Sequence, residues 1–454
     1  MTSNLFKEFE FISEKAWKQQ IQFDLGGKDY NSETNWTSTE GINIKPFFTS
    51  KYKSKNKLYI PDNWNINQTI YLKEESISNE EIKKLISQEV YDLTIYIKSD
   101  SINLDLLFKE VDLTYLNLYF KIDHFNEVLL SNLNNYAKKN KTKFHLDYDL
   151  LGNYISTGNW KFSYKEDIEF FKGVINKLSY FKSVVQLKSS NYQNSGANII
   201  QEIAYSMSQA NEYVDVFGKE IIKKINFQIA VGSNYFFEIA KIQAYRILWK
   251  TISKYHEYPI NDVHIIATPS RRNKTIFDFN NNVIRSTSEC MAAILGGANS
   301  VKNFSYDSIY KNENEFSKRI SRNQLLILKH ECHIDKVKNP ISGCYYINYL
   351  IDEISKKSFE LFKELDSSSG FLNLLKKGTL QRKIKESAQK EQLKFNDKIE
   401  ILVGSNHYQN NDEKMSDQLE INPFPTRKSE KTLIEPIIKK RLAGVIEKTR
   451  LENE

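Results

Sequence analysis

Two kinds of sequence pattern alternate along most of the chain after about Tyr91. Short runs of β-branched and aromatic residues predict strands, and longer amphipathic runs predict helices. The predicted strands are 91–98, 116–121, 143–148, 183–188, 227–231, 263–268 and 300–304, and the helices that follow them are 124–140, 165–181, 197–217, 235–255, 284–295 and 313–329. Repeated strand–helix units require parallel strands joined by right-handed crossovers.

About eight such strands favour closure into a barrel over an open sheet. No Gly-rich phosphate-binding turn follows the first predicted strand, which disfavours a dinucleotide-binding sheet. The pattern therefore predicts an α/β fold, an eight-stranded parallel β/α (TIM-type) barrel. Ligands of such barrels gather at the carboxyl ends of the strands, where we expect a site.

The two ends of the chain depart from this pattern. Residues 5–20 carry apolar side chains at helical spacing. The pair Gly26-Gly27 with Pro46 and Pro61 interrupts 26–71, which predicts an extended wrapping segment. We divide the chain into an N-terminal helix and wrapping segment (1–75), the barrel (76–395) and a C-terminal helical and linker extension (396–454).

The C-terminal part contains further predicted elements. Helices are expected at 346–365 and 371–392, a strand-like run at 398–404, and a polar surface linker at 410–426. The basic stretch 439–450 is amphipathic and predicts a solvated helix, with Pro436 in its first turn.

Composition narrows the functional class. The chain has 454 residues and a net charge of +7, but its 64 basic and 57 acidic side chains are intermixed, a weak indication of nucleic-acid binding. Three widely spaced cysteines form neither a disulfide framework nor a zinc signature. The N-terminus has no apolar signal region, and no stretch of 18 apolar residues occurs. We therefore expect a cytoplasmic protein without nucleic acid, membrane or metal as partners.

Several polar groups are candidates for a site, each with a structural alternative. The basic loop Ser270–Lys274 follows a predicted strand, where it could meet a phosphate or a partner subunit; a solvated basic loop fits equally well. His330 and His333 lie three residues apart on a helix, but no third ligand completes a metal set, which favours packing. Arg246 and Arg285 lie on predicted helices, where structural ion pairs are favoured over substrate contact.

A series of segments carries a resemblance to a known family, in the family's own order. The most informative is Asp278–Ala298, a polar turn followed by a helix of small residues and a Gly-Gly stop. The others are Glu40–Thr49, Ser195–Tyr205, Gly232–Trp249, Arg319–His333 with Asn339–Tyr346, and Ile401–Asn406. Together they resemble the barrel domain of methylmalonyl-CoA mutase, a cobalamin-dependent isomerase.

The resemblance implies where substrate and catalytic groups would lie. In this family coenzyme A runs along the barrel axis, and the acyl group lies at the mouth beneath the cobalt. Catalytic subunits of the family have a histidine shortly before a Gly-Ala pair, which corresponds to Gly196-Ala197 in this chain. The histidine position holds Asn191 here, and the tyrosine position before it holds Ser190. A second family tyrosine corresponds to Thr69. Because asparagine cannot act as a proton-donating imidazolium, no catalytic residue is expected.

The same resemblance leaves Asn191, Gln193 and Arg285 as candidate substrate-binding residues. The family's cobalamin module carries Asp-x-His-x-x-Gly, and the near match Asp262–Ala267 has Ala in place of the Gly and lies on a predicted barrel strand. His264 is therefore interpreted as a hydrogen-bonded strand residue. No second α/β unit follows residue 406, so we expect no cobalamin-binding domain and no cofactor bound by this chain.

Three functional hypotheses follow from the resemblance. The first is the small, non-catalytic subunit of a heterodimeric methylmalonyl-CoA mutase, whose large subunit would bind adenosylcobalamin and isomerise methylmalonyl-CoA and succinyl-CoA. The second is an acyl-CoA-binding catalytic barrel of a split mutase with a separate cobalamin module. The third is a non-enzymatic interaction scaffold. A barrel axis filled by bulky side chains would favour the third, because active barrels of the family need small residues there to admit pantetheine.

Overall fold

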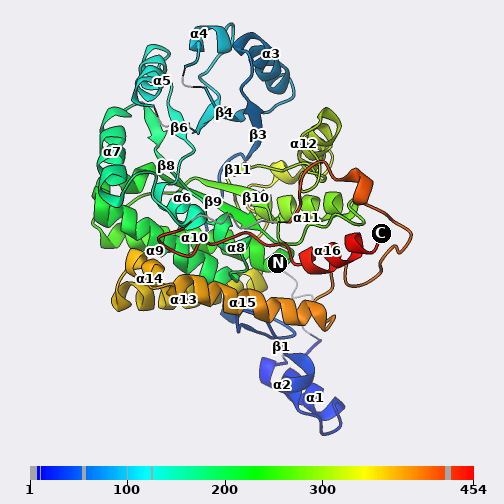
Figure 1. Ribbon diagram of the computed structural model, residues 1–454. Coiled ribbons are helices and arrows are strands. Elements are labelled where there is room, and N and C mark those ends of the chain that lie inside the picture. Colours follow the sequence, from blue (N-terminus) through cyan, green and yellow to red (C-terminus); the bar gives the residue numbers. More distant parts are fainter. Residues whose placement is uncertain (1–7, 11, 54–57, 100, 124–125, 425–430) are drawn as a thin grey trace.

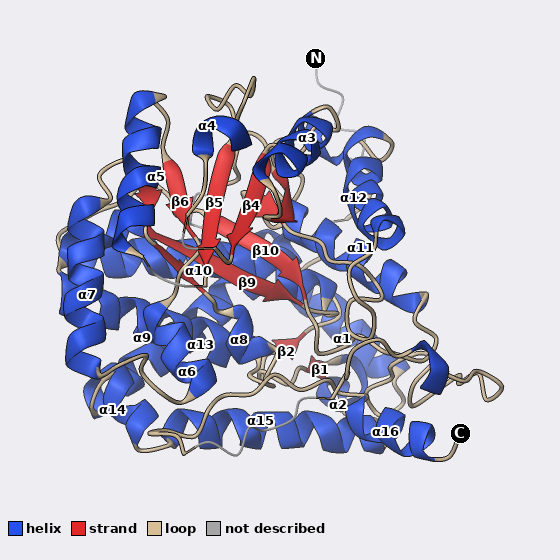
Figure 2. Ribbon diagram, turned by 45° about the horizontal axis from the view of Figure 1, so that its top comes forward, coloured by secondary structure: helices blue, strands red, loops and turns tan. Residues whose placement is uncertain are grey.

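A parallel sheet closes into a barrel at the centre of the computed structural model, which describes residues 8–10, 12–53, 58–99, 101–123, 126–424 and 431–454 (Figure 2). Its order is β7-β6-β5-β4-β3-β11-β10-β9-β8. The bounds are β3 (Asn65–Tyr71), β4 (Asp92–Ile97), β5 (Asn117–Ile122), β6 (Phe144–Leu146), β7 (Phe181–Ser183), β8 (Val185–Leu187), β9 (Ile225–Val231), β10 (Ile265–Pro269) and β11 (Ser300–Val301). Since β7 and β8 are parts of one segment interrupted only at Val184, the barrel has eight strand positions, and the predicted TIM-type fold is confirmed.

Helices form a layer around this barrel (Figure 1). Within it, α10 packs against α9, α11 and α13. The helices after the first strand are α3 (Glu75–Ile86), α4 (Leu104–Leu107), α5 (Glu127–Lys139), α6 (Leu150–Thr157), α7 (Tyr164–Lys177), α8 (Ser190–Gln193), α9 (Ile199–Phe217), α10 (Tyr235–Tyr255), α11 (Asn281–Leu295), α12 (Glu315–His330), α13 (Tyr345–Ser368), α14 (Phe371–Lys376), α15 (Thr379–Asn396) and α16 (Gly444–Glu452). No described helix combines the length and apolar character needed to cross a membrane.

Alternation along the strands separates an apolar outer face from a polar interior. On the outer face, Phe227 of β9 contacts the rings of Tyr245 and Trp249 on α10. On the inner face, the Asn67 and Thr94 side chains of neighbouring strands are hydrogen-bonded at 2.9 Å. Period-two alternation explains this division, but polar residues are unusual inside such barrels, where branched apolar residues dominate.

The first barrel strand corrects the sequence interpretation. β3 lies within 26–71, which the sequence assigned to an extended wrapping segment, so the predicted boundary at residue 75 falls after the first strand of the barrel. Its sequence, NINQTIY, ends in the β-branched and aromatic residues Thr69, Ile70 and Tyr71, but three polar residues in its first half and the prolines before it led to the interpretation as a wrapping segment.

Three C-terminal predictions also differ from the structure. The run 398–404 forms no strand, only an isolated bridge between Val403 and His407. The helix predicted at 371–392 is divided into α14 and α15, because Gly378 has a positive φ between them. Helix α16 begins at Gly444, so Pro436 lies outside its first turn. Residues 5–7, 124–125 and 425–426, at the ends of three predicted segments, lie outside the described residues.

The hairpin of the N-terminal segment contacts the outer helices, whereas the helix that precedes it in the chain lies away from them. It comprises α1 (Glu14–Asp24), α2 (Tyr30–Thr34) and a hairpin of β1 (Trp36–Thr37) and β2 (Asn43–Ile44). The Tyr349 hydroxyl on α13 donates a hydrogen bond to the Asn43 carbonyl, which attaches the hairpin to the body. Helix α1 has no buried residue and projects from the molecule (Figure 1).

A buried ion cluster ties the carboxyl end of β9 to two outer helices. Lys241 of α10 donates to Glu202 of α9 at 2.9 Å and to the carbonyl of Ala230 at 2.6 Å, and it also pairs with Glu238. The Lys241 side chain is fully buried. Burial raises the pKa of Glu202 to about 7. The cluster positions α9 and α10 against the end of the barrel where a site is expected.

Replacing Lys241 by Ala should lower the free energy of unfolding by about 3–5 kcal/mol, because two buried carboxylates would lose their counter-charge. Urea unfolding followed by circular dichroism measures the change. Lys250→Ala, at an exposed position on the same helix, is the control and should stay within about 0.5 kcal/mol of the parent. A loss below about 1 kcal/mol for Lys241→Ala would contradict the role assigned to the cluster.

Candidate functional site

A cavity of about 510 Å³ lies at the carboxyl ends of the barrel strands. Residues at or just after five strands contribute to its lining: Thr69 and Tyr71, Tyr96, Lys121, Lys188, and Thr268 and Pro269. Helix α8 adds Ser190 and Asn191, and the loops after β10 and β11 add Arg271 and Lys302. The expectation of a site at this end of the barrel therefore coincides with a real cavity.

The C-terminal extension closes one side of this cavity. Its backbone N–H groups at Lys440 and Leu442 donate to the carbonyls of Asn194 and Arg272, at 2.9 and 2.8 Å. These bonds hold the chain beside the loops after β8 and β10, and Lys439 thereby reaches the cavity lining.

The cavity is strongly basic. Lys188 pairs with Asp147 at 3.3 Å, whereas among the described residues the hydrogen-bond partner of Lys302 Nζ is the Thr94 hydroxyl, at 3.2 Å. Lys121 lies over the Tyr96 ring, 4.2 Å from its centre. Burial lowers the pKa of Lys302 to about 8; attraction by Asp147 opposes this shift, and repulsion from Lys121 and Lys188 adds to it. The cations at this mouth therefore repel one another.

Aromatic rings fill the barrel axis below the cavity. The Tyr119 hydroxyl of β5 is hydrogen-bonded to His264 Nε2, just before β10, at 2.7 Å. These two strands are four positions apart in a ring of eight, so the bond crosses the barrel. His145 of β6 stacks on Tyr119 with ring centres 4.5 Å apart and bonds the Ser183 hydroxyl at 2.8 Å. The axis is thus bridged beneath the mouth.

Polar groups continue to the amino ends of the strands. Asp92 accepts hydrogen bonds from the amides of Asn65 and Asn117, both at 2.8 Å. Burial raises the pKa of Asp92 to about 6. The two interior histidines shift the opposite way for the same reason: burial lowers the pKa of His264 to about 3 and holds that of His145 well below its usual value. Both imidazoles are neutral near pH 7.

The structure brings some predicted site residues together and separates others. Thr69, Ser190 and Asn191 all line the cavity. Gln193 instead accepts a hydrogen bond from the Ser270 hydroxyl at 3.0 Å. Arg285 donates to Thr275 and Asn282 and to the Val403 carbonyl, and it is not among the lining residues. A substrate-binding role for Asn191, Gln193 or Arg285 stays a prediction.

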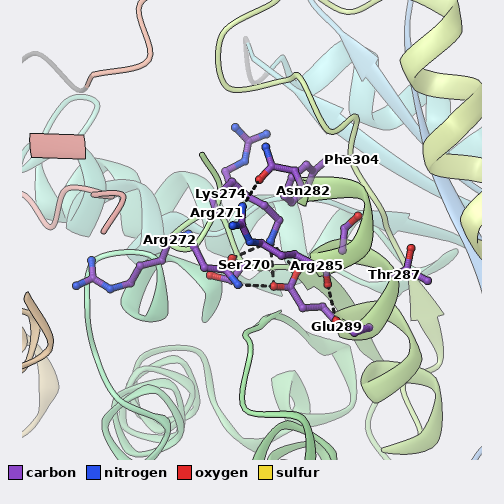
Figure 3. A network of polar contacts seen from close by, with 12 residues as sticks. Ser270, Arg271, Arg272, Lys274, Asn282, Arg285, Thr287, Glu289 and Phe304 are labelled. Carbon is purple, nitrogen blue, oxygen red and sulfur yellow. Dashed lines mark hydrogen bonds and ion pairs between the residues drawn. The ribbon is translucent and has the colours of Figure 1, made fainter. Parts of the chain in front are cut away.

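Two cations of the basic loop 270–274 form ion pairs within the protein, and the third lines the cavity (Figure 3). Arg272 pairs with Glu391 of α15, and Lys274 pairs with the buried Glu289 of α11 at 2.8 Å. Arg271 faces the cavity and lies 5.1 Å from the centre of the Phe304 ring. Only this one of the loop's three cations is left to meet a ligand.

The strand-end lysines are the main feature that sequence reasoning missed. Lys121, Lys188 and Lys302 each follow an apolar residue at the end of a strand, in the runs LYFK, VQLK and SVK. A charged residue at the carboxyl end of a barrel strand is a signal for a site. The signal was available, but it depends on knowing which strand positions face inward.

The other histidine candidates lie away from the cavity. His330 is 3.3 Å from Glu89, and His333 occupies a left-handed turn beyond the end of α12. Within the described part of the chain, no three His, Cys, Asp or Glu side chains are grouped so as to hold a metal ion. Arg246 pairs with Asp262, so the predicted structural ion pair is confirmed there. For Arg285 the prediction is wrong, because its partners among the described residues are neutral.

Known proteins resemble the chain over most of its length. Residues 89–449 match the family model of methylmalonyl-CoA mutase. The chain is 30% identical to the methylmalonyl-CoA mutase small subunit of Porphyromonas gingivalis, over 99% of this chain and 78% of that one. It is 29% identical to the methylmalonyl-CoA mutase of Rhizobium meliloti (57% of this chain, 37% of that one) and 26% identical to that of Escherichia coli (64% and 42%). It thus covers less than half of either of these two mutases.

The interior histidines should make the protein less stable in mild acid. Their folded pKa values lie below the unfolded value of about 6.5, so the unfolded chain binds more protons as the pH falls below 6.5. Each histidine should then lower the free energy of unfolding by about 1.4 kcal/mol per pH unit between pH 6 and 5. Urea titrations at several pH values measure how the free energy of unfolding depends on pH. His264→Gln should reduce this slope by the amount that corresponds to one proton, about 1.4 kcal/mol per pH unit. The exposed His330→Gln is the control, and an unchanged slope for His264→Gln would refute the assignment.

Proposed function

The chain belongs to the methylmalonyl-CoA mutase family, and we propose that it is the small, non-catalytic subunit of a heterodimeric mutase. In this proposal a large subunit binds adenosylcobalamin and acyl-CoA and interconverts methylmalonyl-CoA and succinyl-CoA. The small chain stabilises that subunit through an extensive interface. The similarity to a small subunit along 99% of this chain supports the assignment.

The bridged barrel axis supports the non-catalytic part of the proposal. It suits an interaction scaffold equally, and the similarity to a mutase small subunit favours a mutase partner over that alternative. Tyr119 and His264 join opposite strands where family barrels admit coenzyme A. Asn191 lies at the cavity in place of the family's catalytic histidine, and the described lining of the cavity contains no histidine. A bound substrate would therefore find neither an axial channel nor an imidazole acid at the mouth.

The residues present do not fit a cobalamin ligand set. His264, in the sequence that most resembles the cobalt-binding motif, is inside the barrel with Nε2 bonded to Tyr119. Binding cobalt there would require breaking the hydrogen bond that bridges the axis. We therefore assign the cofactor and its radical chemistry to the partner subunit.

The projecting helix α1 supports the partner part of the proposal. It exposes 80% of Phe23 and 40% of Trp17, although Trp17 also contacts Phe47. An arm with no buried residue of its own gains stability when its apolar side chains are covered by another surface. We assign that surface to the large subunit.

Co-expression with the large subunit, size-exclusion chromatography and an assay with adenosylcobalamin test the whole proposal. A stable, active complex is expected, and Asn191→Ala should leave its kcat within about twofold because no proton transfer depends on that side chain. The split-mutase alternative makes the reverse prediction. It requires activity with a free cobalamin module alone, abolished by Asn191→Ala, and that result would refute the small-subunit role.

The arm can be tested separately. Phe23→Ser should weaken the complex at least tenfold, because an apolar side chain buried at the interface would be lost. Tyr255→Ser, at an exposed site on α10, is the matched control and should leave the affinity unchanged. Titration of labelled large subunit by fluorescence anisotropy measures both. Equal affinities for the two variants would show that α1 lies outside the interface.

A further inference from the structure

The cavity at the barrel mouth concentrates positive charge far beyond what its own carboxylates balance. Its lining contains eight basic side chains and two acidic ones, Asp147 and Glu313. Asp147 pairs with Lys188, and Glu313 pairs with Lys318 at 3.2 Å. Among the described residues, the remaining six basic side chains of the lining form no ion pair: Lys121, Arg271, Lys302, Lys311, Arg322 and Lys439.

The unpaired cations of the cavity lower the stability of the folded protein unless a bound anion balances their charge. Like charges that share a partly desolvated cavity raise one another's electrostatic energy. At Lys302 the nearest polar partner is the neutral Thr94 hydroxyl, and Lys121 and Lys188 repel its charge, although the carboxylate of Asp147 attracts it without forming an ion pair. A cleft of one sign of charge also focuses its field and concentrates ligands of the opposite sign.

The positions of the cations favour phosphate over other anions. Arg271 and Lys302 lie in the loops after the seventh and eighth strand positions of the barrel, β10 and β11. Phosphate sites of β/α barrels are frequently built from these two loops. Arg supplies a planar fork of donors and Lys a compact charge, the two groups that bind phosphate oxygens. The side-chain amides of Asn67, Asn191 and Asn194 offer further donors to the lining.

We propose that this cavity binds a small molecule through a diphosphate or triphosphate group. A volume of about 510 Å³ matches a small-molecule site, and the bridged axis closes its floor. Several separate cations around one cavity suit a chain of linked phosphates better than a single charge. The proposal goes beyond the subunit role and concerns this chain alone, so its test does not depend on a mutase partner.

Isothermal titration calorimetry on the full chain, at constant ionic strength, tests the proposal with inorganic pyrophosphate. One site per chain is expected, with a Kd at least tenfold lower than for citrate, a trivalent anion without phosphate. Parallel titrations with ADP and with coenzyme A show whether the diphosphate belongs to a free anion, a nucleotide or coenzyme A. Absence of pyrophosphate binding, or citrate binding as tight as pyrophosphate, would overturn the proposal.

Two variants locate the site. Lys302→Met and Arg271→Gln should each raise the Kd for pyrophosphate at least tenfold, whereas Lys172→Gln, on α7 and outside the cavity, should not change it. Without ligand, Lys302→Met should raise the melting temperature because it removes a repelled charge, which also shows that the variant folds. Unchanged affinity in both cavity variants would mean that pyrophosphate binds elsewhere and would refute this site.

Binding should also take up protons near pH 8. The groups that act on Lys302 are the cations Lys121 and Lys188 and the carboxylates Asp147 and Glu313. Lys439 also lines the cavity, and burial, followed by repulsion from Arg271, Lys188 and Lys121, lowers its pKa to about 8. A bound anion raises the pKa values of Lys302 and Lys439, so affinity is greatest below pH 8 and falls as the pH rises to 9. The binding enthalpy at pH 8 should therefore differ between Tris and HEPES buffers. Equal enthalpies would contradict contact between these two lysines and the anion, and in Lys302→Met a smaller difference between the buffers is expected.

Discussion

The hydrogen bond between Tyr119 and His264 joins opposite sides of the barrel, and the other interior groups are arranged around it. A buried polar group is costly unless it has a partner, so a polar interior is stable only as a connected network. His145 extends the network to Ser183. At the amino ends of the strands, Asp92 accepts hydrogen bonds from the side-chain amides of Asn65 and Asn117. Removing one member would take at least one hydrogen bond from each neighbour that it contacts.

This network divides the barrel into a closed lower part and an open mouth. A substrate chain cannot pass along an axis occupied by hydrogen-bonded rings, so the interior has become a structural core. The mouth keeps its cavity because strand-end lysines line it with charge in place of apolar bulk. Under the proposed small-subunit role, the division accounts for a chain that keeps the family's barrel fold while its axis serves as a structural core.

The sequence predicted elements well where their residues face an apolar layer. Both ends of α10 agree with the predicted 235–255, because its apolar residues recur at helical spacing. β3 was missed since its inward Asn and Thr residues resemble a loop, and the strand-end lysines were missed because a lysine beside a turn usually faces water. Arg271 and Arg272 show the limit most clearly. They are adjacent and chemically identical, yet one lines the cavity and the other pairs with Glu391.

Some buried cations of this chain contact a carboxylate and others do not, and this difference helps to interpret the cavity at the barrel mouth. Lys241 and Lys274 are fully enclosed and meet the carboxylates Glu202 and Glu289 directly. At these two enclosed positions the fold places a carboxylate beside the cation, as the cost of an unpaired buried charge requires. Lys302, at the mouth, has no carboxylate within ion-pair distance among the described residues, although it also loses hydration. A general tolerance for unpaired cations does not account for this contrast, whereas a counter-anion supplied from solution does.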